Sequence, residues 1–217
     1  MTESKPSPPR GPALDYRKTR AETRHAVSEA AVDAAVELLE EGGPEAVTVR
    51  RVAAMVGAST QVIYTLFGGK PGLAGAVFGR GHELLRAALE AAPAGEDSLI
   101  DLRRQGEAYR RRALENPNLY RVMFGDSLGV MEPDEAAAAA AAASFTALVD
   151  AVERCQRDGR VRDGDPVEIA RTVFATCHGA ASLELSGRTP PDLDLDQTYD
   201  RILQTLFSGL APDAAPG

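Results

Sequence analysis

Apolar residues recur at helical spacing along most of the chain. Four of them, separated by four, three and four positions, mark one face of a first helix: Val27, Ala31, Ala34 and Leu38. This stripe predicts a helix over residues 19–41, which a pair of glycines then ends. No segment shows a convincing alternation of apolar and polar residues with a period of two, so the sequence predicts an all-α fold.

Three further helices are predicted directly after the first. Thr48 is a good N-cap for a second helix, whose apolar side begins at Val49. Gly57 ends that helix and Ser59 begins a third. The pair at 68–69 ends the third helix, and the proline that follows Lys70 fits the first turn of a fourth.

Beyond residue 81 every strong signal is helical. Helices are predicted over 97–115, 116–124, 132–157, 165–186 and 194–209. The long one contains eight consecutive alanines, Ala136 to Ala143, a residue type with the highest helix propensity that also allows close helix packing. We therefore expect about nine helices.

Composition adds a charge argument. The net charge of −8 by itself disfavours a nucleic-acid partner. However, residues 1–81 carry ten Lys and Arg against nine Asp and Glu, so all the net negative charge lies in residues 82–217.

The two cysteines, Cys155 and Cys177, form neither a metal-ligand spacing nor a disulfide framework, so we expect no metal and no cofactor. Because no run of about 20 apolar residues and no signal peptide is visible, the sequence predicts a cytoplasmic protein without a membrane segment.

The segment 57–73 has the arrangement of a helix-turn-helix, in which a short helix enters the DNA major groove by its N-terminal end. Thr60 and Gln61 lie in the first turn of that helix, and Gln can bond adenine through two hydrogen bonds. Val62 is suited to a thymine methyl. Tyr64 and Lys70 are candidates for phosphate contacts, as are Thr48 and Ser59 at the two N-caps.

A basic cluster lies upstream of this segment. Arg17, Lys18, Arg20 and Arg24 place four positive charges within eight residues. Such a cluster adds salt-dependent, non-specific affinity for DNA, although a solvated arm is an alternative explanation. An ordinary helical hairpin is likewise an alternative for the helix-turn-helix itself.

The same residues resemble the N-terminal signature of the tetracycline-repressor (TetR) family of transcription regulators. The resemblance spans about residues 22–75 without gaps and rests on seven residues behind the Thr48–Val49 pair: Ala53, Gly57, Ser59, Tyr64, Phe67, Lys70 and Leu73. It implies a DNA-binding set of Thr48, Ser59, Thr60, Gln61, Val62, Tyr64 and Lys70, to which we add Arg17, Lys18 and Arg20. The family often has a basic residue and a glycine after the serine, and here Thr60 and Gln61 replace them.

The resemblance also implies a domain organisation, in which a three-helix DNA-binding domain precedes a C-terminal helical bundle. We expect a disordered tail over 1–18, a DNA-binding domain over 19–68, an effector-binding and dimerisation domain over 69–210, and a second tail over 211–217. Phe174 with His178-Gly179 is similar to a TetR C-terminal domain type named for a Trp-His-Gly signature. The candidate effector-binding residues are Tyr109, Met123, Phe124, Phe145 and His178, for which ordinary core packing is the alternative.

The function implied is a repressor that binds a near-palindromic operator as a homodimer and is released by a small molecule. The last two helices are the family's usual dimer interface. Their candidate contacts are Thr172, Ala175, Thr176, Gly179, Ala180, Leu183, Ile202, Leu203, Leu206 and Phe207. An effector-independent regulator or an activator is the alternative, and an enzyme using His178 with Cys177 or Glu184 is a remote one. We expect no enzymatic activity. Adjacent helical residues point about 100° apart, so Cys177 and His178 cannot easily face one substrate.

Overall fold

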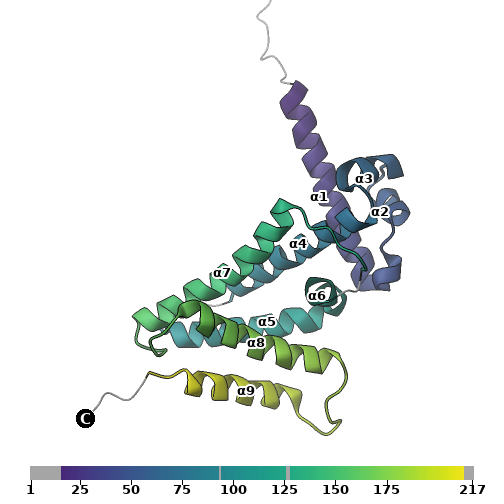
Figure 1. Cartoon of the computed structure of the whole chain (residues 1–217). Helices are drawn as coiled ribbons and strands as arrows, with labels where there is room; N and C mark the ends of the chain where they lie inside the picture. The colour runs from purple at the N-terminus through teal and green to yellow at the C-terminus, as the bar shows by residue number, and fades with distance from the viewer. Residues whose placement is uncertain (1–15, 93, 126–127, 213–217) are drawn as a thin grey trace, which may run out of the picture.

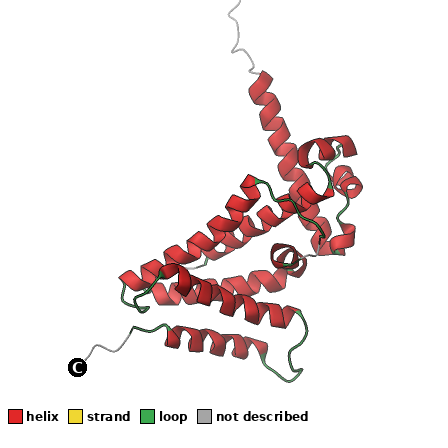
Figure 2. Ribbon diagram, viewed as in Figure 1, coloured by secondary structure: helices red, strands yellow, loops and turns green. Residues whose placement is uncertain are grey.

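The computed structural model describes residues 16–92, 94–125 and 128–212. All the regular secondary structure in these ranges is helical, as predicted (Figure 2). Figure 1 shows a long first helix standing upright beside two short ones, above a layered group of longer helices. Most of the predicted tails 1–18 and 211–217 falls outside the described residues. The structure corrects the end of the first tail, because residues 16–18 already belong to the first helix.

The described residues form nine α-helices and one short 3₁₀ helix. The first four α-helices and the 3₁₀ turn are α1 (Tyr16–Gly42), η1 (Pro44–Ala46), α2 (Val49–Met55), α3 (Thr60–Phe67) and α4 (Lys70–Glu90). The remaining five are α5 (Ser98–Glu115), α6 (Pro117–Phe124), α7 (Glu135–Arg157), α8 (Pro166–Leu185) and α9 (Leu195–Gly209). The predicted count of about nine helices is therefore confirmed, and η1 is an addition that the sequence pattern did not indicate.

Aspartate side chains begin four of these helices. Asp97, Asp134, Asp165 and Asp194 each accept a hydrogen bond from a backbone amide in the first turn of the helix that follows. A carboxylate at this position satisfies unpaired amides and interacts favourably with the helix dipole. The long alanine-rich helix thus begins at Glu135, three residues later than predicted, because Asp134 is the residue that caps it.

Glycines on α4 allow α7 and the segment before it to approach closely. A Cβ atom placed on Gly79 would lie 2.8 Å from the Cα and Cβ atoms of Ala137, and one on Gly75 would lie 2.3 Å from a backbone oxygen of Glu132. Both distances are shorter than van der Waals contact allows. The absence of a side chain at these two positions therefore sets how tightly the N-terminal end of α7 packs on α4.

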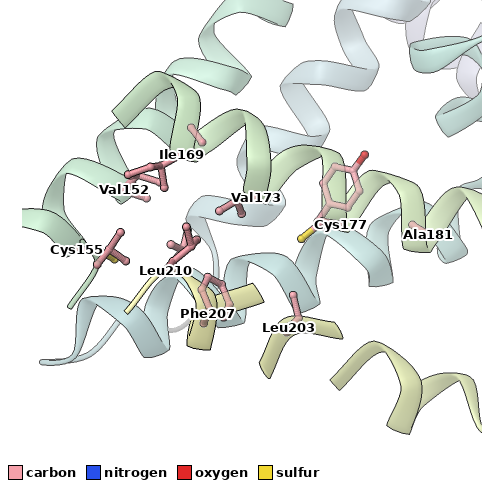
Figure 3. Packing of buried hydrophobic residues seen from close by; sticks show 14 of the residues in the cluster. Val152, Cys155, Ile169, Val173, Cys177, Ala181, Leu203, Phe207 and Leu210 are labelled. Atoms are coloured by element: carbon pink, nitrogen blue, oxygen red, sulfur yellow. The ribbon is translucent and has the colours of Figure 1, made fainter. Parts of the chain in front are cut away.

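Two hydrophobic cores organise the molecule. The first core, called here the head core, lies among α1, α2, α3 and the first half of α4, and includes the fully buried Leu39, Ile63 and Leu73. The second, the body core, lies among α5, α7, α8 and α9, and Figure 3 shows part of it around Val173, Cys177 and Leu203. Helix α6 supplies side chains to both cores.

Helix α7 is long and apolar enough, by length and composition, to cross a membrane, which the prediction from the sequence did not recognise. Its alanines account for this property. Length and composition alone are weak evidence for a membrane segment, because core helices of soluble proteins share them. In the structure α7 packs along α4, α5 and α8.

The close contact of α4 with α7 gives a first testable prediction. Replacing Gly79 with alanine should destabilise the protein, because the added methyl group meets the backbone of Ala137 and forces the helices apart. We expect a loss of about 1–3 kcal/mol in the free energy of unfolding, measured by chemical denaturation. A matched control is Gly209→Ala at the end of α9, where an added Cβ meets no atom within 4 Å. Equal stability of the two variants would contradict this account of the packing.

Candidate functional site

Helix α3 buries one side and presents the other to solvent. Ile63 is fully buried, and Phe67 packs against the same core. Thr60 and Gln61 are exposed, and Val62 and Tyr64 are 38% and 51% exposed. An apolar valine and a large aromatic ring are thus held at the surface of a short helix. The surface of α3 opposite the head core is therefore available to a partner.

The two predicted N-caps differ in what their side chains do. The Thr48 hydroxyl accepts a hydrogen bond from the Arg51 amide at 3.2 Å, so Thr48 caps α2 as predicted. Ser59 occupies the N-cap position of α3, but its side chain forms no capping hydrogen bond. Ser59 therefore begins α3 as predicted, but its hydroxyl does not satisfy the first amides of the helix. Its exposed hydroxyl lies at the N-terminal end of α3, where the unpaired amides of the helix also lie.

Tyr64 and Lys70 meet at the turn between α3 and α4. Gly68 and Gly69 have φ angles of 71° and 133°, a region that favours glycine, and they reverse the chain after α3. The Tyr64 ring lies over this turn, since a Cβ atom on Gly69 would be 3.5 Å from its Cε1 atom. Lys70 is the first residue of α4. The structure thus places both residues at one end of the exposed surface of α3.

The predicted basic cluster lies on the exposed first turns of α1. Arg17 and Arg20 line an open groove of about 610 Å³ whose opposite wall includes Gln61 and Val62 of α3. Lys18 does not line this groove, and its Nζ atom lies 4.0 Å from a carboxylate oxygen of Glu22. The cluster is therefore helical, and its members point in different directions.

Four residues of this surface were absent from the predicted set. Arg50 and Arg51 lie in the first turn of α2, beside Thr48. Arg24 and Thr65 line the groove between α1 and α3. The consecutive arginines after an N-cap were a usable signal, and so was the position of Thr65 four residues after Gln61, on the same helix face.

The structure brings two of the predicted effector-binding residues into hydrogen-bonding contact inside the body. The Tyr109 hydroxyl lies 3.2 Å from Nδ1 of His178, and the Tyr120 hydroxyl lies 2.7 Å from the same nitrogen. The two hydroxyl groups are 3.3 Å apart, with Tyr109 donating to Tyr120. Three polar groups from α5, α6 and α8 therefore satisfy one another in an apolar interior.

Aromatic rings enclose this polar triad. Phe124 lies edge-on to His178 with ring centroids 4.8 Å apart, and Phe174 stacks on His178 at 5.4 Å. Tyr120 and Phe174 were not among the predicted effector-binding residues, because their helices place them beside the others only in the folded chain. We call Tyr109, Tyr120, Phe124, Phe174 and His178 the aromatic cluster.

The two other candidate effector residues lie outside the aromatic cluster. Met123 lines a cavity of about 10 Å³ on one side of Tyr109 and packs against both cores. Phe145 of α7 is partly buried against the body core, and its ring forms none of the aromatic contacts described above. A second cavity, of about 40 Å³, is lined by Tyr109, Phe174 and Cys177. The interior next to Tyr109 is thus closely packed, and a small molecule would have to displace side chains to enter.

Burial keeps the groups of the interior neutral. It raises the pKa values of the Tyr109 and Tyr120 phenols and of the Cys177 thiol, and it lowers the pKa of His178. In each case desolvation disfavours the charged form. A thiol with a raised pKa forms little of the reactive thiolate, which agrees with a packing role for Cys177.

The last two helices expose part of the predicted dimer surface. Leu183 is 58% exposed, and Thr172 is exposed on the same helix. By contrast, Leu203 and Phe207 are 0% and 7% exposed because they pack in the body core of their own chain, so the prediction that they face a partner is wrong. A surface groove of about 530 Å³ instead runs along residues of α8, α9 and the loop between them: Thr176, Leu193, Thr198, Arg201, Ile202, Thr205 and Leu206.

Two family models match the sequence and together span most of the described chain. Residues 31–77 match the model described as "Bacterial regulatory proteins, tetR family". Residues 102–206 match the model described as "Tetracyclin repressor-like, C-terminal domain". The chain belongs to the TetR family of transcription regulators. The more specific Trp-His-Gly resemblance of the C-terminal half stays a prediction.

Several solved structures share the fold of this chain. A protein of unknown function from Rhodococcus sp. RHA1 is 27% identical with a TM-score of 0.73, and the match covers 85% of this chain and 95% of that one. A TetR family transcription regulator from Marinobacter aquaeolei VT8 is 20% identical with a TM-score of 0.61, covering 89% and 98%. The TetR family regulator PfmR from Thermus thermophilus is 23% identical with a TM-score of 0.59, covering 83% and 98%. No curated protein matches the sequence.

The arrangement considered for an enzyme does not form in this TetR family chain. The Glu184 carboxylate accepts two hydrogen bonds from Arg110, at 2.7 and 2.8 Å, instead of orienting His178. Nδ1 of His178 is held by the two tyrosines, and Cys177 is buried with a raised pKa. The three groups named for that alternative therefore serve the packing of α8 against α5 and α6.

A second histidine provides a pH-dependent prediction. His82 of α4 is buried against Phe78 and Phe124, and its Nδ1 atom lies 3.0 Å from the Ser144 hydroxyl of α7. Desolvation lowers the pKa of His82 to about 4. Between pH 6.5 and pH 4 the unfolded chain therefore binds a proton that the folded chain excludes, and stability falls as the pH falls.

We expect this linkage to remove on the order of 2 kcal/mol of stability between about pH 6.5 and pH 4. Urea denaturation across this pH range measures it. His82→Gln is the matched variant, since its amide can still donate to Ser144 but does not titrate. Its stability should vary less with pH than that of the parent protein, and parallel curves for the two proteins would refute the assignment.

Proposed function

We propose that this protein is a transcriptional repressor that binds a near-palindromic operator as a homodimer. The observation that carries the proposal is the exposed face of α3, on which Gln61 and Val62 are held at the surface by the burial of Ile63. A polar amide and an apolar valine at the N-terminal end of a short helix match the groups that read base edges in the major groove.

Each remaining residue of the surface has a proposed role. Thr60 contacts base edges beside Gln61, and Ser59 and Thr48 contact phosphates at the N-terminal ends of α3 and α2. Tyr64 and Lys70 anchor the DNA backbone at the other end of α3, beside the α3–α4 turn. Arg17, Lys18 and Arg20 supply salt-dependent affinity. Because α3 itself has no positively charged side chain, these flanking cations carry the attraction to DNA.

The charge distribution of the chain agrees with this orientation. Residues 1–81 are nearly neutral overall with basic groups concentrated at the surface just described, whereas residues 82–217 are strongly acidic. An acidic body is repelled by DNA, so electrostatics favours approach by the head. We propose the head, residues 19–68, as the DNA-binding domain and residues 69–210 as the dimerisation and effector-binding domain, in a protein of the cytoplasm.

Dimerisation is proposed through the outer faces of α8 and α9. Leu183 contributes an apolar side chain there, and Ile202 and Leu206 line the groove along the same two helices. A two-fold axis through this surface presents two α3 helices to two half-sites, which is why a near-palindromic operator is expected.

A small molecule is proposed to release the DNA by binding at the aromatic cluster. Tyr109, Phe124 and His178 provide ring surfaces and neutral hydrogen-bonding groups, with Met123 and Phe145 at the periphery. A ligand that binds one arrangement of these helices better than another shifts the population of DNA-binding states. The small size of the cavities next to Tyr109 supports a closed arrangement of the cluster, which a ligand would open.

Loss of the phosphate anchors tests the groove assignment. The double variant Tyr64→Ala, Lys70→Ala should bind its operator at least about tenfold more weakly, because it loses two proposed contacts in each half-site. The measurement is a gel shift on DNA upstream of the gene, or on a duplex selected from a random pool. Arg111→Ala, an exposed arginine of α5, is the control. Unchanged affinity and specificity in the double variant would show that α3 does not bind in the DNA major groove.

A charge in the proposed interface tests dimerisation. Leu183→Glu should convert the dimer into a monomer, because the carboxylate would be buried without a partner at the two-fold contact. Light scattering after gel filtration measures the mass, and circular dichroism confirms that the variant folds. Val130→Glu, at a valine that is 77% exposed in the loop before α7, is the control. A Leu183→Glu variant that kept the mass of the parent dimer would place the interface elsewhere.

A further inference from the structure

The first turns of α1 project beyond the head core. Every residue from 17 to 26 is exposed, and α1 (purple in Figure 1) rises past α2 and α3. At about 1.5 Å per residue, these residues extend roughly 15 Å. Because they continue a helix that is already formed, they avoid the cost of nucleating a new one.

The projecting turns carry arginines on the face that is buried farther along the same helix. Taking about 100° per residue, Arg20 and Arg24 fall within the arc of helix face occupied lower down by Ala31, Ala35 and Leu38, which are buried in the head core. The face of α1 that packs on the head core at residues 31–38 therefore lies beside α3 and solvent at residues 20–24, which we call the tip of α1. On this face the residues are arginines in the exposed turns and apolar in the buried part of the helix.

Three acidic residues in the N-terminal two thirds of α1, namely Glu22, Glu29 and Asp33, lie on the other side of the helix, and each is paired with a cation. Glu22 is paired with Lys18 at 4.0 Å. Glu29 and Asp33 bind Arg80 of α4 at 2.5 and 3.1 Å. No such ion pair joins Arg20 or Arg24 to an acidic group in the described part of the chain. In this part of α1 the paired acidic residues and the two arginines therefore lie on different faces, and the arginine face is the one left to an external anion.

The arginine face and α3 form the two walls of one groove. The groove has an open volume of about 610 Å³. One wall includes Arg20, Arg24 and Val27, and the other includes Gln61 and Thr65. Hence any DNA duplex bound on the outer face of α3 lies next to the tip of α1. The volume is lined mainly by carbon atoms, with guanidinium groups among them, a surface that suits the sugar edge and the phosphates of a nucleic-acid strand.

We propose that the tip of α1 is a second DNA-binding element, a helical clamp whose Arg20 and Arg24 grip the phosphate backbone just outside the half-site read by α3. The proposal rests on the proposed function and deepens it, because it assigns an extended backbone footprint to a helix face. It also separates the basic residues by role, since Lys18 lies off this face. The operator contacted by the protein is consequently longer than the segment read by the two α3 helices.

Salt dependence and footprinting test the clamp. For the variant Arg20→Ala, Arg24→Ala, the slope of log K against log salt should fall by about 1.8 per protomer, from about 0.9 per phosphate contact. Hydroxyl-radical footprints at saturating protein should lose the outermost backbone protection and keep the central protection. Both side chains are exposed, so the thermal midpoint should not change.

Two controls separate position from charge. Arg111→Ala, Arg157→Ala removes the same charge from exposed sites on α5 and α7 and should leave slope and footprint unchanged. A relocation variant combines Arg20→Ala and Arg24→Ala with Glu22→Gln and Ala26→Arg, which restores the net charge on the opposite face of α1. It should behave like the double variant.

The remaining outcomes each decide the question. The clamp would be overturned if the relocation variant restored the slope and the outer protection. It would also be overturned if the Arg20→Ala, Arg24→Ala variant kept the parent slope, lost the central and outer protection together, or changed its oligomeric mass. If the parent protein shows no sequence-specific footprint, the proposed function fails instead. In that case the slope measured on a random duplex still tests the clamp, which is supported if the slope falls and overturned if it does not.

Discussion

The two cores of this protein share one short helix, and most of the architecture depends on that sharing. Two residues of α6, Leu119 and Val122, are 1% exposed in the head core. Two others, Tyr120 and Phe124, join the aromatic cluster of the body. A helix of 8 residues cannot satisfy both environments unless the head and the body hold one relative position, since close packing admits few alternatives.

Polar contacts fix the same junction from the side of α1. The Leu119 amide donates to a Glu40 carboxylate oxygen at 2.7 Å, and the Asn118 side chain donates to the Leu39 carbonyl at 3.0 Å. The first bond satisfies an amide at the start of α6 with a charge that the helix dipole favours. A shift of α6 toward or away from the aromatic cluster would therefore act directly on the end of α1, the helix whose other end projects beside α3 (Figure 1).

The sequence was most informative where a local rule decides the structure. The helix ends predicted at Thr48 and Gly57, and the helix starts predicted at residues 97, 165 and 194, agree with the structure, because capping depends on residues only a few positions apart. The aromatic cluster could not be assembled in this way. Tyr120 and Phe174 come from separate helices, and their meeting depends on how α6 and α8 pack. The inward direction of Leu203 is likewise a property of the packed body, since an apolar residue at helical spacing fits either a core or a partner surface.

The hydrogen bonds among Tyr109, Tyr120 and His178 limit which ligands could bind inside the body. Tyr109, Tyr120 and His178 already satisfy one another, and opening the cluster without replacement would leave buried polar groups unpaired, at about 1–3 kcal/mol each. A molecule that bound there would have to offer both a ring surface and a hydrogen-bonding group. A carboxylate in contact with the triad would meet neutral phenols and an imidazole whose pKa burial has lowered, with no cation among the three to compensate its desolvation. Within the triad a ligand would therefore meet ring surfaces and neutral hydrogen-bonding groups, and among the described residues the one cation lining the cavity of about 10 Å³ beside Tyr109 is Arg112.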